Sequence, residues 1–363
     1  MDPRIREHAE IIATHSVDLQ EGDNVVVDAH PVAEDLVVAL HEVIGDRGAN
    51  PLTTSQRTGK RGLRAFLRAA DGEFETPSHE LALIEETDVY IAIRASDNVT
   101  QTADVDPEVS AAYQQAHHPI LEERLSKRWC LTQFPAPANA QLAEMSTEGY
   151  ENFVWDAVNK EWDAQRELQA NMVEILDPAE EVRIVSGETT DVTMSVAGNP
   201  TLNDYGERNL PGGEVFTAPV PDSVEGEVLF DMPLYHQGRE VTDVSLEFED
   251  GEVIAHSAGK NEEVLTEVLD TDEGARRLGE LGIGMNRDID RFTYNMLFDE
   301  KMGDTVHMAV GRAYDDTVGE DNERNDSAVH VDMIVDMSED SFIEVDGERV
   351  QEDGTFVFEE SED

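Results

Sequence analysis

The sequence predicts an α/β protein in which an N-terminal α/β domain with a mostly parallel sheet precedes an α+β catalytic domain rich in antiparallel strands. In the first half, continuous apolar strands alternate with helices, which is typical of a parallel sheet covered on both faces. In the second half, short strands of alternating polarity are separated by Gly, Asn and Asp turns, which favours antiparallel pairing. We place the boundary after residue 178, so that the domains span residues 1–178 and 179–363.

The first domain is expected to begin with an amphipathic helix over residues 3–17, because Ile5, Ala9 and Ile12 share one helical face. The apolar run at 24–28 predicts the first strand. It is followed by helix 32–44, strand 51–54, basic helix 61–70 and strand 88–93. No G-x-G-x-x-G motif follows the first strand, so the sequence predicts no dinucleotide cofactor.

The second domain is expected to consist mainly of short strands. The predicted strands are 182–185, 192–196, 227–235, 241–247, 306–311, 329–337 and 356–358. Two helices are expected among them, at 261–269 and 273–281. The acidic residues 359–363 are expected to form a solvated terminus.

The charge of the chain restricts the environment in which the protein can be stable and the classes of partner that it can bind. Asp and Glu number 81 against 26 Lys and Arg, of which five are Lys, giving a formal charge of -55. Such a surface repels itself unless salt screens it, and the acids are spread over the whole chain. The sequence therefore predicts a protein of an extremely halophilic, haloarchaeon-like microbe. It excludes nucleic acid and anionic membranes as partners, because both need clustered Lys and Arg.

The cellular compartment is expected to be the cytoplasm. The first residues contain no apolar stretch of the kind found in export signals, and no later run approaches a membrane span. The lone Cys130 lies in an apolar run and is interpreted as a small core residue.

Two histidines lie in apolar, alternating segments and are candidates for metal ligands. In the segment 329–333, the strand period of two places His330 and Asp332 on one face, where both side chains can reach one point. In the segment 305–311, His307 shares a face with small neighbours that leave room beside its ring, and Tyr314 follows just beyond this segment. Each pattern alone is weak, because a single histidine on a strand is more often a hydrogen-bonded core residue.

Glu214 is a third candidate because of the residues before it. Pro211, Gly212 and Gly213 fix the backbone just ahead of this one acid, in an otherwise apolar setting. Such a frame suits a metal ligand. It equally suits a turn that leads into a strand with a solvated carboxylate at its end.

Several motifs in order resemble the thermophilic-type metalloaminopeptidases, peptidase family M29 (aminopeptidase T/S-like). The motif N-x-P-G-G-E-V-F-T-A-P occupies 209–219, and the segment L-G-E-L-G-I-G with the family's second acid occupies 278–284. D-E-K at 299–301 precedes G-x-T-x-H-x-A-x-G-x-x-Y at 303–314, and N-x-S-x-x-H-x-D occupies 325–332. The resemblance extends over essentially the whole chain, including E-G-D-x-V-V-V at 21–27.

The resemblance implies an aminopeptidase that removes N-terminal residues from peptides by a two-metal, water-activated mechanism. The implied metal ligands are Glu214, Glu280, His307, His330 and Asp332, with Tyr314 and Glu280 as catalytic residues. Five side chains can hold two divalent ions (Zn, Co or Mn) only if a carboxylate bridges them, and Glu214 and Glu280 are both candidates. The resemblance also implies peptide substrates and a homodimer.

Two alternatives remain open at this point. The related dihydroxypyridine dioxygenases use one iron on two His and one carboxylate, a set that His307, His330 and Asp332 would satisfy. A non-catalytic binding protein on the same fold is the other alternative. The presence of both Glu214 and Glu280 favours two metals and therefore the peptidase.

Overall fold

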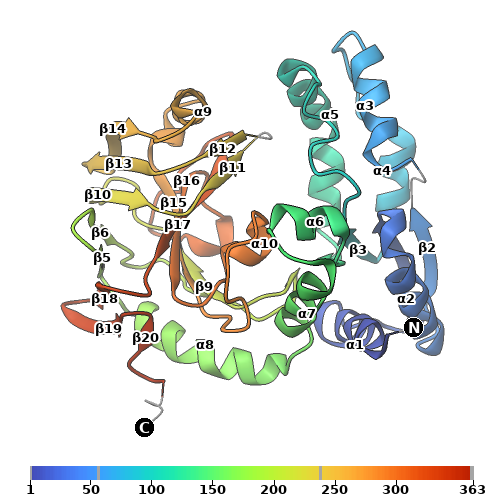
Figure 1. Cartoon of the computed structure of the whole chain (residues 1–363), viewed down its shortest axis with the longest axis horizontal. Helices are drawn as coiled ribbons and strands as arrows, with labels where there is room; N and C mark the ends of the chain where they lie inside the picture. The colour runs from blue at the N-terminus through green and yellow to red at the C-terminus, as the bar shows by residue number, and fades with distance from the viewer. Residues whose placement is uncertain (1, 55–57, 237–238, 360–363) are drawn as a thin grey trace. The chain divides into compact units, whose positions relative to one another are not determined.

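The computed structural model describes residues 2–54, 58–236 and 239–359, drawn in Figure 1 from blue to red along the chain. It contains two compact units, Met1–Lys160 with Gly206–Gly212, and Glu161–Tyr205 with Gly213–Asp363. The units thus divide ahead of helix α8 (Trp162–Leu176), whereas the sequence pattern placed the boundary after it. None of the helices in the described ranges has the length and apolar character of a membrane span.

The first unit contains the predicted parallel sheet. Its strand order is β2-β1-β3-β4-β8, and every neighbouring pair is parallel. The strands are β1 (Asn24–Ala29), β2 (Asn50–Thr54), β3 (Val89–Arg94), β4 (Arg128–Gln133) and β8 (Asn209–Leu210). The three strands predicted from apolar runs are therefore confirmed, with bounds that differ by one residue at each end at most.

The helices of the first unit include three that were predicted. The first begins at a Pro that follows the N-cap Asp2, whose carboxylate accepts the Arg4 N–H at 2.9 Å. The predicted helices are α1 (Pro3–Ile11) continued by η1 (Ile12–Ser16), α2 (Glu34–Asp46) preceded by η2 (Pro31–Ala33), and α3 (Lys60–Ala69). Further helices are α4 (Ser78–Glu85), α5 (Pro107–Leu125), α6 (Pro137–Leu142) and α7 (Thr147–Val158).

The antiparallel pairing predicted for the second half is confirmed, because the described residues of the second unit form two main antiparallel sheets and a two-stranded one. The larger main sheet has the order β14-β13-β10-β6-β5-β18-β19-β20. Its strands are β5 (Glu181–Ser186), β6 (Thr190–Ser195), β10 (Glu225–Phe230), β13 (Val244–Glu249), β14 (Glu252–Ser257), β18 (Ser341–Val345), β19 (Glu348–Glu352) and β20 (Thr355–Phe356). Two predicted strands, 227–235 and 241–247, are each split, because a hairpin of β11 (Leu234–His236) and β12 (Arg239–Val241) separates β10 from β13.

The smaller sheet has the order β17-β16-β15-β9-β7, and all its pairs are antiparallel. Its strands are β7 (Leu202–Asp204), β9 (Glu214–Thr217), β15 (Leu278–Gly284), β16 (Thr305–Gly311) and β17 (His330–Asp336). One apolar core joins this sheet to the larger one and includes Met308, Val335, Val192 and Phe230. On β15, β16 and β17, alternate residues belong to that core, so the residues between them project from the opposite face.

The helix predicted at 273–281 is wrong. Only a short turn, η3 (Gly274–Arg276), precedes β15, and all seven residues of β15 are buried. A strand that is covered on both faces shows no polar alternation, so the sequence did not reveal it. The second predicted helix is present as α9 (Glu262–Leu269), and a short α10 (Met296–Asp299) lies ahead of β16. Of the predicted solvated terminus, all but Glu359 lies outside the described residues.

Candidate metal centre

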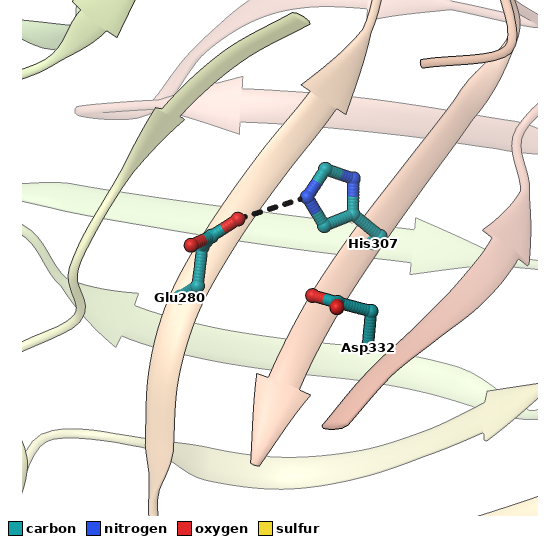
Figure 2. Close-up of side chains that lie close together, drawn as sticks. All are labelled: Glu280, His307 and Asp332. Carbon is teal, nitrogen blue, oxygen red and sulfur yellow. Dashed lines mark hydrogen bonds and ion pairs between the residues drawn. The ribbon is translucent and has the colours of Figure 1, made fainter. Parts of the chain in front are cut away.

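Three neighbouring strands of the smaller sheet carry side chains that point toward one another. Figure 2 shows Glu280 on β15, His307 on β16 and Asp332 on β17, with one ligand atom from each within 4.8 Å of the others. Strand register explains the convergence, because Ala309 lies opposite both Glu280 and Asp332. The small Ala309 side chain leaves the space above it to the two carboxylates.

The remaining predicted ligands lie beside this group. His307 Nε2 is 3.1 Å from Glu280 Oε1 and 3.5 Å from Glu214 Oε2. His330 Nε2 is 3.4 Å from Asp332 Oδ1 and 3.8 Å from Glu280 Oε2. Glu280 therefore turns one oxygen toward each histidine. The structure thus brings together the five side chains that the resemblance implied as ligands.

Two glycines stand where close packing around the cluster leaves no space for a side chain. Gly282 lies directly opposite His307, and a Cβ at Gly282 would overlap the imidazole ring. Gly213 has a φ of 120°, and a Cβ there would overlap the Asn286 side chain. The close approach of these backbones explains why the glycines stand at these positions.

His330 is oriented by the loop before it. Its Nδ1 lies 2.8 Å from the carbonyl oxygen of Arg312, which leaves Nε2 to the acids. Asn325 donates to the carbonyls of Gly274 and Gly311, at 2.9 and 2.5 Å. A histidine whose second ring nitrogen is held in this way is typical of metal ligands.

Burial and opposite charges act against each other on the ionisable groups. Burial raises the pKa of Glu214 and of Glu280. Burial also works against ionisation of Asp332, but the neighbouring His330 and His307 outweigh it and lower the Asp332 pKa to about 2. Burial opposes the charged form of both histidines as well. Their carboxylate neighbours outweigh it and raise the pKa of His307 to about 9 and that of His330 to about 10. The carboxylates of the cluster thus stabilise positive charge in the space that they surround.

The cluster has the donors and the unmet bonding capacity of a divalent metal site. Among the described residues, Glu214 Oε2, Glu280 Oε2 and His307 Nδ1 are buried without a hydrogen-bond partner. A buried carboxylate oxygen without a partner is costly, and a cation between such oxygens removes that cost. Carboxylate and imidazole donors in combination suit Zn, Co or Mn. The residues therefore fit divalent metal ions.

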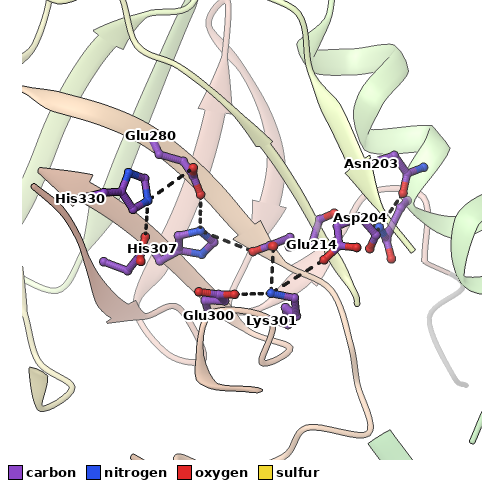
Figure 3. A network of polar contacts seen from close by, with 10 residues as sticks. Asn203, Asp204, Glu214, Glu280, Glu300, Lys301, His307 and His330 are labelled. Carbon is purple, nitrogen blue, oxygen red and sulfur yellow. Dashed lines mark hydrogen bonds and ion pairs between the residues drawn. The ribbon is translucent and has the colours of Figure 1, made fainter. Parts of the chain in front are cut away.

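Lys301 is a part of the site to which the sequence pattern gave no role. Figure 3 shows its ammonium in contact with Glu214, at 3.0 Å, with Glu300, and with Asp204, at 3.8 Å. The side chain is fully buried, at 0% exposure. Burial lowers the pKa of Lys301, but the charges of its three acids outweigh it and raise that pKa well above its usual range. In the sequence, the scarcity of lysine was the one feature that could have drawn attention to Lys301.

Tyr314 follows β16 and lies at the rim of the cluster. Its ring is 4.9 Å from that of His330 and 6.5 Å from that of Phe216, measured between centroids. The residue is 48% exposed, so one side of it faces outward. Burial of the hydroxyl and the charge of Glu280 raise the pKa of Tyr314, so that the hydroxyl stays protonated and able to donate a hydrogen bond.

Comparisons with known proteins agree over the whole length of the chain. Residues 1–360 match the family model described as thermophilic metalloprotease (M29). The chain is 27% identical to Aminopeptidase 2 of Geobacillus stearothermophilus, with 97% of this chain and 95% of the relative covered. It is 29% identical to Aminopeptidase T of Thermus aquaticus, with 96% and 95% covered.

Two solved structures are similar to this fold. Wild-type AmpT from Thermus thermophilus matches with a TM-score of 0.85 and 25% identity, covering 98% of this chain and 99% of that one. The 2,5-dihydroxypyridine dioxygenase from Pseudomonas putida KT2440 matches with a TM-score of 0.60 and 16% identity, covering 99% of each chain. The second likeness concerns the fold alone.

Proposed function

The chain belongs to the thermophilic metalloprotease family M29, and from that membership we propose that Glu214, Glu280, His307, His330 and Asp332 hold two divalent metal ions. Its family and its relatives give the activity: the chain is a metal-dependent aminopeptidase, a hydrolase that acts on peptide bonds. The single observation that carries the proposal is the position of Glu280, with one oxygen directed at each of two histidines.

The contacts support a particular division of the ligands. Glu214 and His307 would hold a first ion together with Oε1 of Glu280. His330 and Asp332 would hold a second ion together with Oε2 of Glu280. Glu280 would then be the bridging carboxylate. Glu214 is the weaker candidate for that role, because Lys301 occupies its Oε1.

The charge of the buried cluster also supports two divalent ions. Its charged members other than the histidines are one ammonium and five carboxylates: Lys301, Glu214, Glu280, Asp332, Glu300 and Asp204. The histidines must be neutral to bind a metal, and five negative charges and one positive charge then leave four negative charges. Two divalent ions balance them, whereas one ion leaves two negative charges buried.

When bound, the ions would lower the pKa of a water molecule from ~15.7 toward ~7 and polarise the scissile carbonyl group. Tyr314 would donate a hydrogen bond to the oxygen that becomes negative during the attack. The free amine of the substrate would bind at the cluster, either as a ligand of one ion or as an ammonium group beside a carboxylate. That requirement for a free amine explains removal of N-terminal residues.

The finer assignments are also proposals. We assign Zn, Co or Mn as the metal, because these ions accept mixed imidazole and carboxylate ligands. The formal charge of -55 supports a halophilic, haloarchaeon-like source and a cytoplasm rich in salt. A homodimer and a fold division at residue 178 remain predictions from the family resemblance and from the sequence pattern. Ring cleavage by a single iron is not favoured, since it leaves Glu214 and Glu280 without a role.

The function can be tested with amino-acid p-nitroanilides in molar potassium chloride. The protein loaded with Zn²⁺, Co²⁺ or Mn²⁺ should release nitroaniline, the chelated protein should not, and an acetylated substrate should remain intact. Glu280→Gln should lose both activity and bound metal. If activity survives in Glu280→Gln with unchanged metal content, the bridging assignment is wrong.

A further inference from the structure

Lys301 is the most unusual charged residue of the second unit. It is one of only five lysines in a chain of formal charge -55, yet it is fully buried. An ammonium group without water is costly unless its hydrogen-bond donors are used. The carboxylates of Glu214 and Glu300 lie within hydrogen-bond distance of the Lys301 ammonium, and that of Asp204 lies 3.8 Å away. With this many acids around it, the ammonium is not available to a substrate.

The backbone on the lysine side of this contact is fixed. The Lys301 N–H donates to Phe298, and its carbonyl accepts from Asn286, each at 3.0 Å. The turn before it is held by the buried carboxylate of Asp299, which accepts the Thr293 N–H at 2.8 Å and its hydroxyl at 2.7 Å. The main chain that carries the Lys301 side chain is therefore held in place by these hydrogen bonds.

The backbone on the glutamate side is fixed as well. Gly213 packs against Asn286, and its carbonyl accepts the Met285 N–H at 2.7 Å. The Glu214 carbonyl accepts a hydrogen bond from the Gln169 side chain at 2.9 Å. Both partners of the Lys301–Glu214 pair are thus held in place by contacts other than the pair itself.

The pair leaves the two oxygens of Glu214 in different roles. Oε1 accepts from the ammonium at 3.0 Å. Oε2 lies 3.5 Å from His307 Nε2 and is buried without a hydrogen-bond partner among the described residues. Only Oε2 is therefore free to bind an ion.

From this geometry we propose that Lys301 is the positioning residue of the first metal ion. Its ammonium holds Oε1 of Glu214 and so directs Oε2 toward the ion that His307 also binds. The second ion would be held by His330, Asp332 and the other oxygen of Glu280, and not by Glu214. The inference rests on the proposed two-metal function, since it names the residue that fixes one of the ligands.

The test measures Co²⁺ binding by the full chain in molar potassium chloride, by metal analysis and by the absorption spectrum of the bound ion. Lys301→Met should bind the first ion about 10- to 100-fold more weakly, which is typical when the partner of a ligand is removed. Affinity for the second ion should stay within about threefold. Lys260→Met is the matched control, because Lys260 pairs with Glu240 at 2.5 Å on the surface and is 53% exposed.

A second pair of variants tests whether Lys301 affects binding of the first ion through its contact with Glu214. Glu214→Gln should weaken the same ion, and adding Lys301→Met to it should cause no further loss, because contacting residues act non-additively. Of the three carboxylates that Lys301→Met would leave without their ammonium, the double variant removes the most buried, that of Glu214, which is 7% exposed against 12% for Asp204 and 16% for Glu300. It therefore remains informative if Lys301→Met alone does not fold.

Three results would overturn the inference. Lys301→Met could bind both ions as the unsubstituted chain does, it could weaken both ions equally, or the double variant could lose affinity beyond Glu214→Gln. An unsubstituted chain that binds fewer than two Co²⁺ ions would instead contradict the proposed function, so the two failures are distinguishable.

Discussion

The imidazole of His307 lies against the backbone of Gly282, its partner on the adjacent strand, with no space for a side chain between them. This proposed metal ligand is held from two directions, by the carboxylates at its Nε2 and by the strand beneath its ring. The ring is also fully buried. The position of His307 thus depends on the absence of a side chain at Gly282 as well as on the neighbouring carboxylates.

Gly282→Ala is therefore expected to push the His307 ring away from the carboxylates. Overpacking of this kind costs about 1 to 3 kcal/mol of the free energy of unfolding, and metal affinity should fall with it. Denaturant unfolding and Co²⁺ titration check the two effects. Gly45→Ala is the control, because Gly45 lies in α2 with open space around it and should tolerate the change. Unchanged Co²⁺ affinity in Gly282→Ala would contradict this description of the site.

Tyr314→Phe tests the hydrogen bond assigned to the developing oxyanion. The substitution keeps the ring contacts with His330 and Phe216 and removes only the hydroxyl. We expect kcat to fall by about 10²-fold or more, the usual effect of losing one such donor, while KM and metal content change little. A kcat near that of the unsubstituted chain would show that Tyr314 only packs.

His8 is expected to make the first unit sensitive to acid. It is fully buried, its Nε2 lies 2.8 Å from the Thr132 hydroxyl, and burial lowers its pKa to about 3. The unfolded chain protonates near pH 6.5, so between these values the unfolded state binds the extra proton. Stability from neutral His8 is thus complete above pH 6.5 and is lost as the pH falls.

The expected loss is about 1.5 kcal/mol between pH 6.5 and pH 5. It can be measured as the difference in the pH dependence of unfolding between the unsubstituted chain and His8→Gln. This difference removes the contribution of the many carboxylates, which both proteins share. Parallel pH profiles would contradict the expectation.

Salt should control the stability of the whole chain. Lowering potassium chloride from about 1 M to about 0.1 M lengthens the Debye length from roughly 3 Å to roughly 10 Å, and the charge of -55 then repels itself over longer distances. The melting temperature should fall markedly. Sucrose, which favours the folded state without screening charge, should not replace the salt. Equal stability in low salt would argue against a halophilic origin.

The sequence predicted the parallel and antiparallel sheets because their strands carry clear apolar patterns. His330 and Asp332 were assigned to one face of a strand from period two alone, and in the structure Nε2 and Oδ1 lie 3.4 Å apart. Periodicity was sufficient there because β17 has one face in the core and one at the cluster.

Two features of the site could not be predicted locally. The first part of the strand that carries Glu280, residues 278–281, was predicted as a helix, because the burial of this strand on both faces and its three glycines depend on neighbours distant in sequence. Lys301 had no assigned role, because its environment is created by Asp204 and Glu214, which lie 97 and 87 residues earlier in the chain. Local pattern carries no information about such contacts.

Metal titration of the chelated protein tests the central claim most directly. Co²⁺ is added stepwise in molar potassium chloride while bound metal and release of nitroaniline from an amino-acid p-nitroanilide are both measured. Two ligand groups joined by Glu280 predict that binding is complete, and activity maximal, at two ions per chain. Full aminopeptidase activity with a single bound ion would contradict the account.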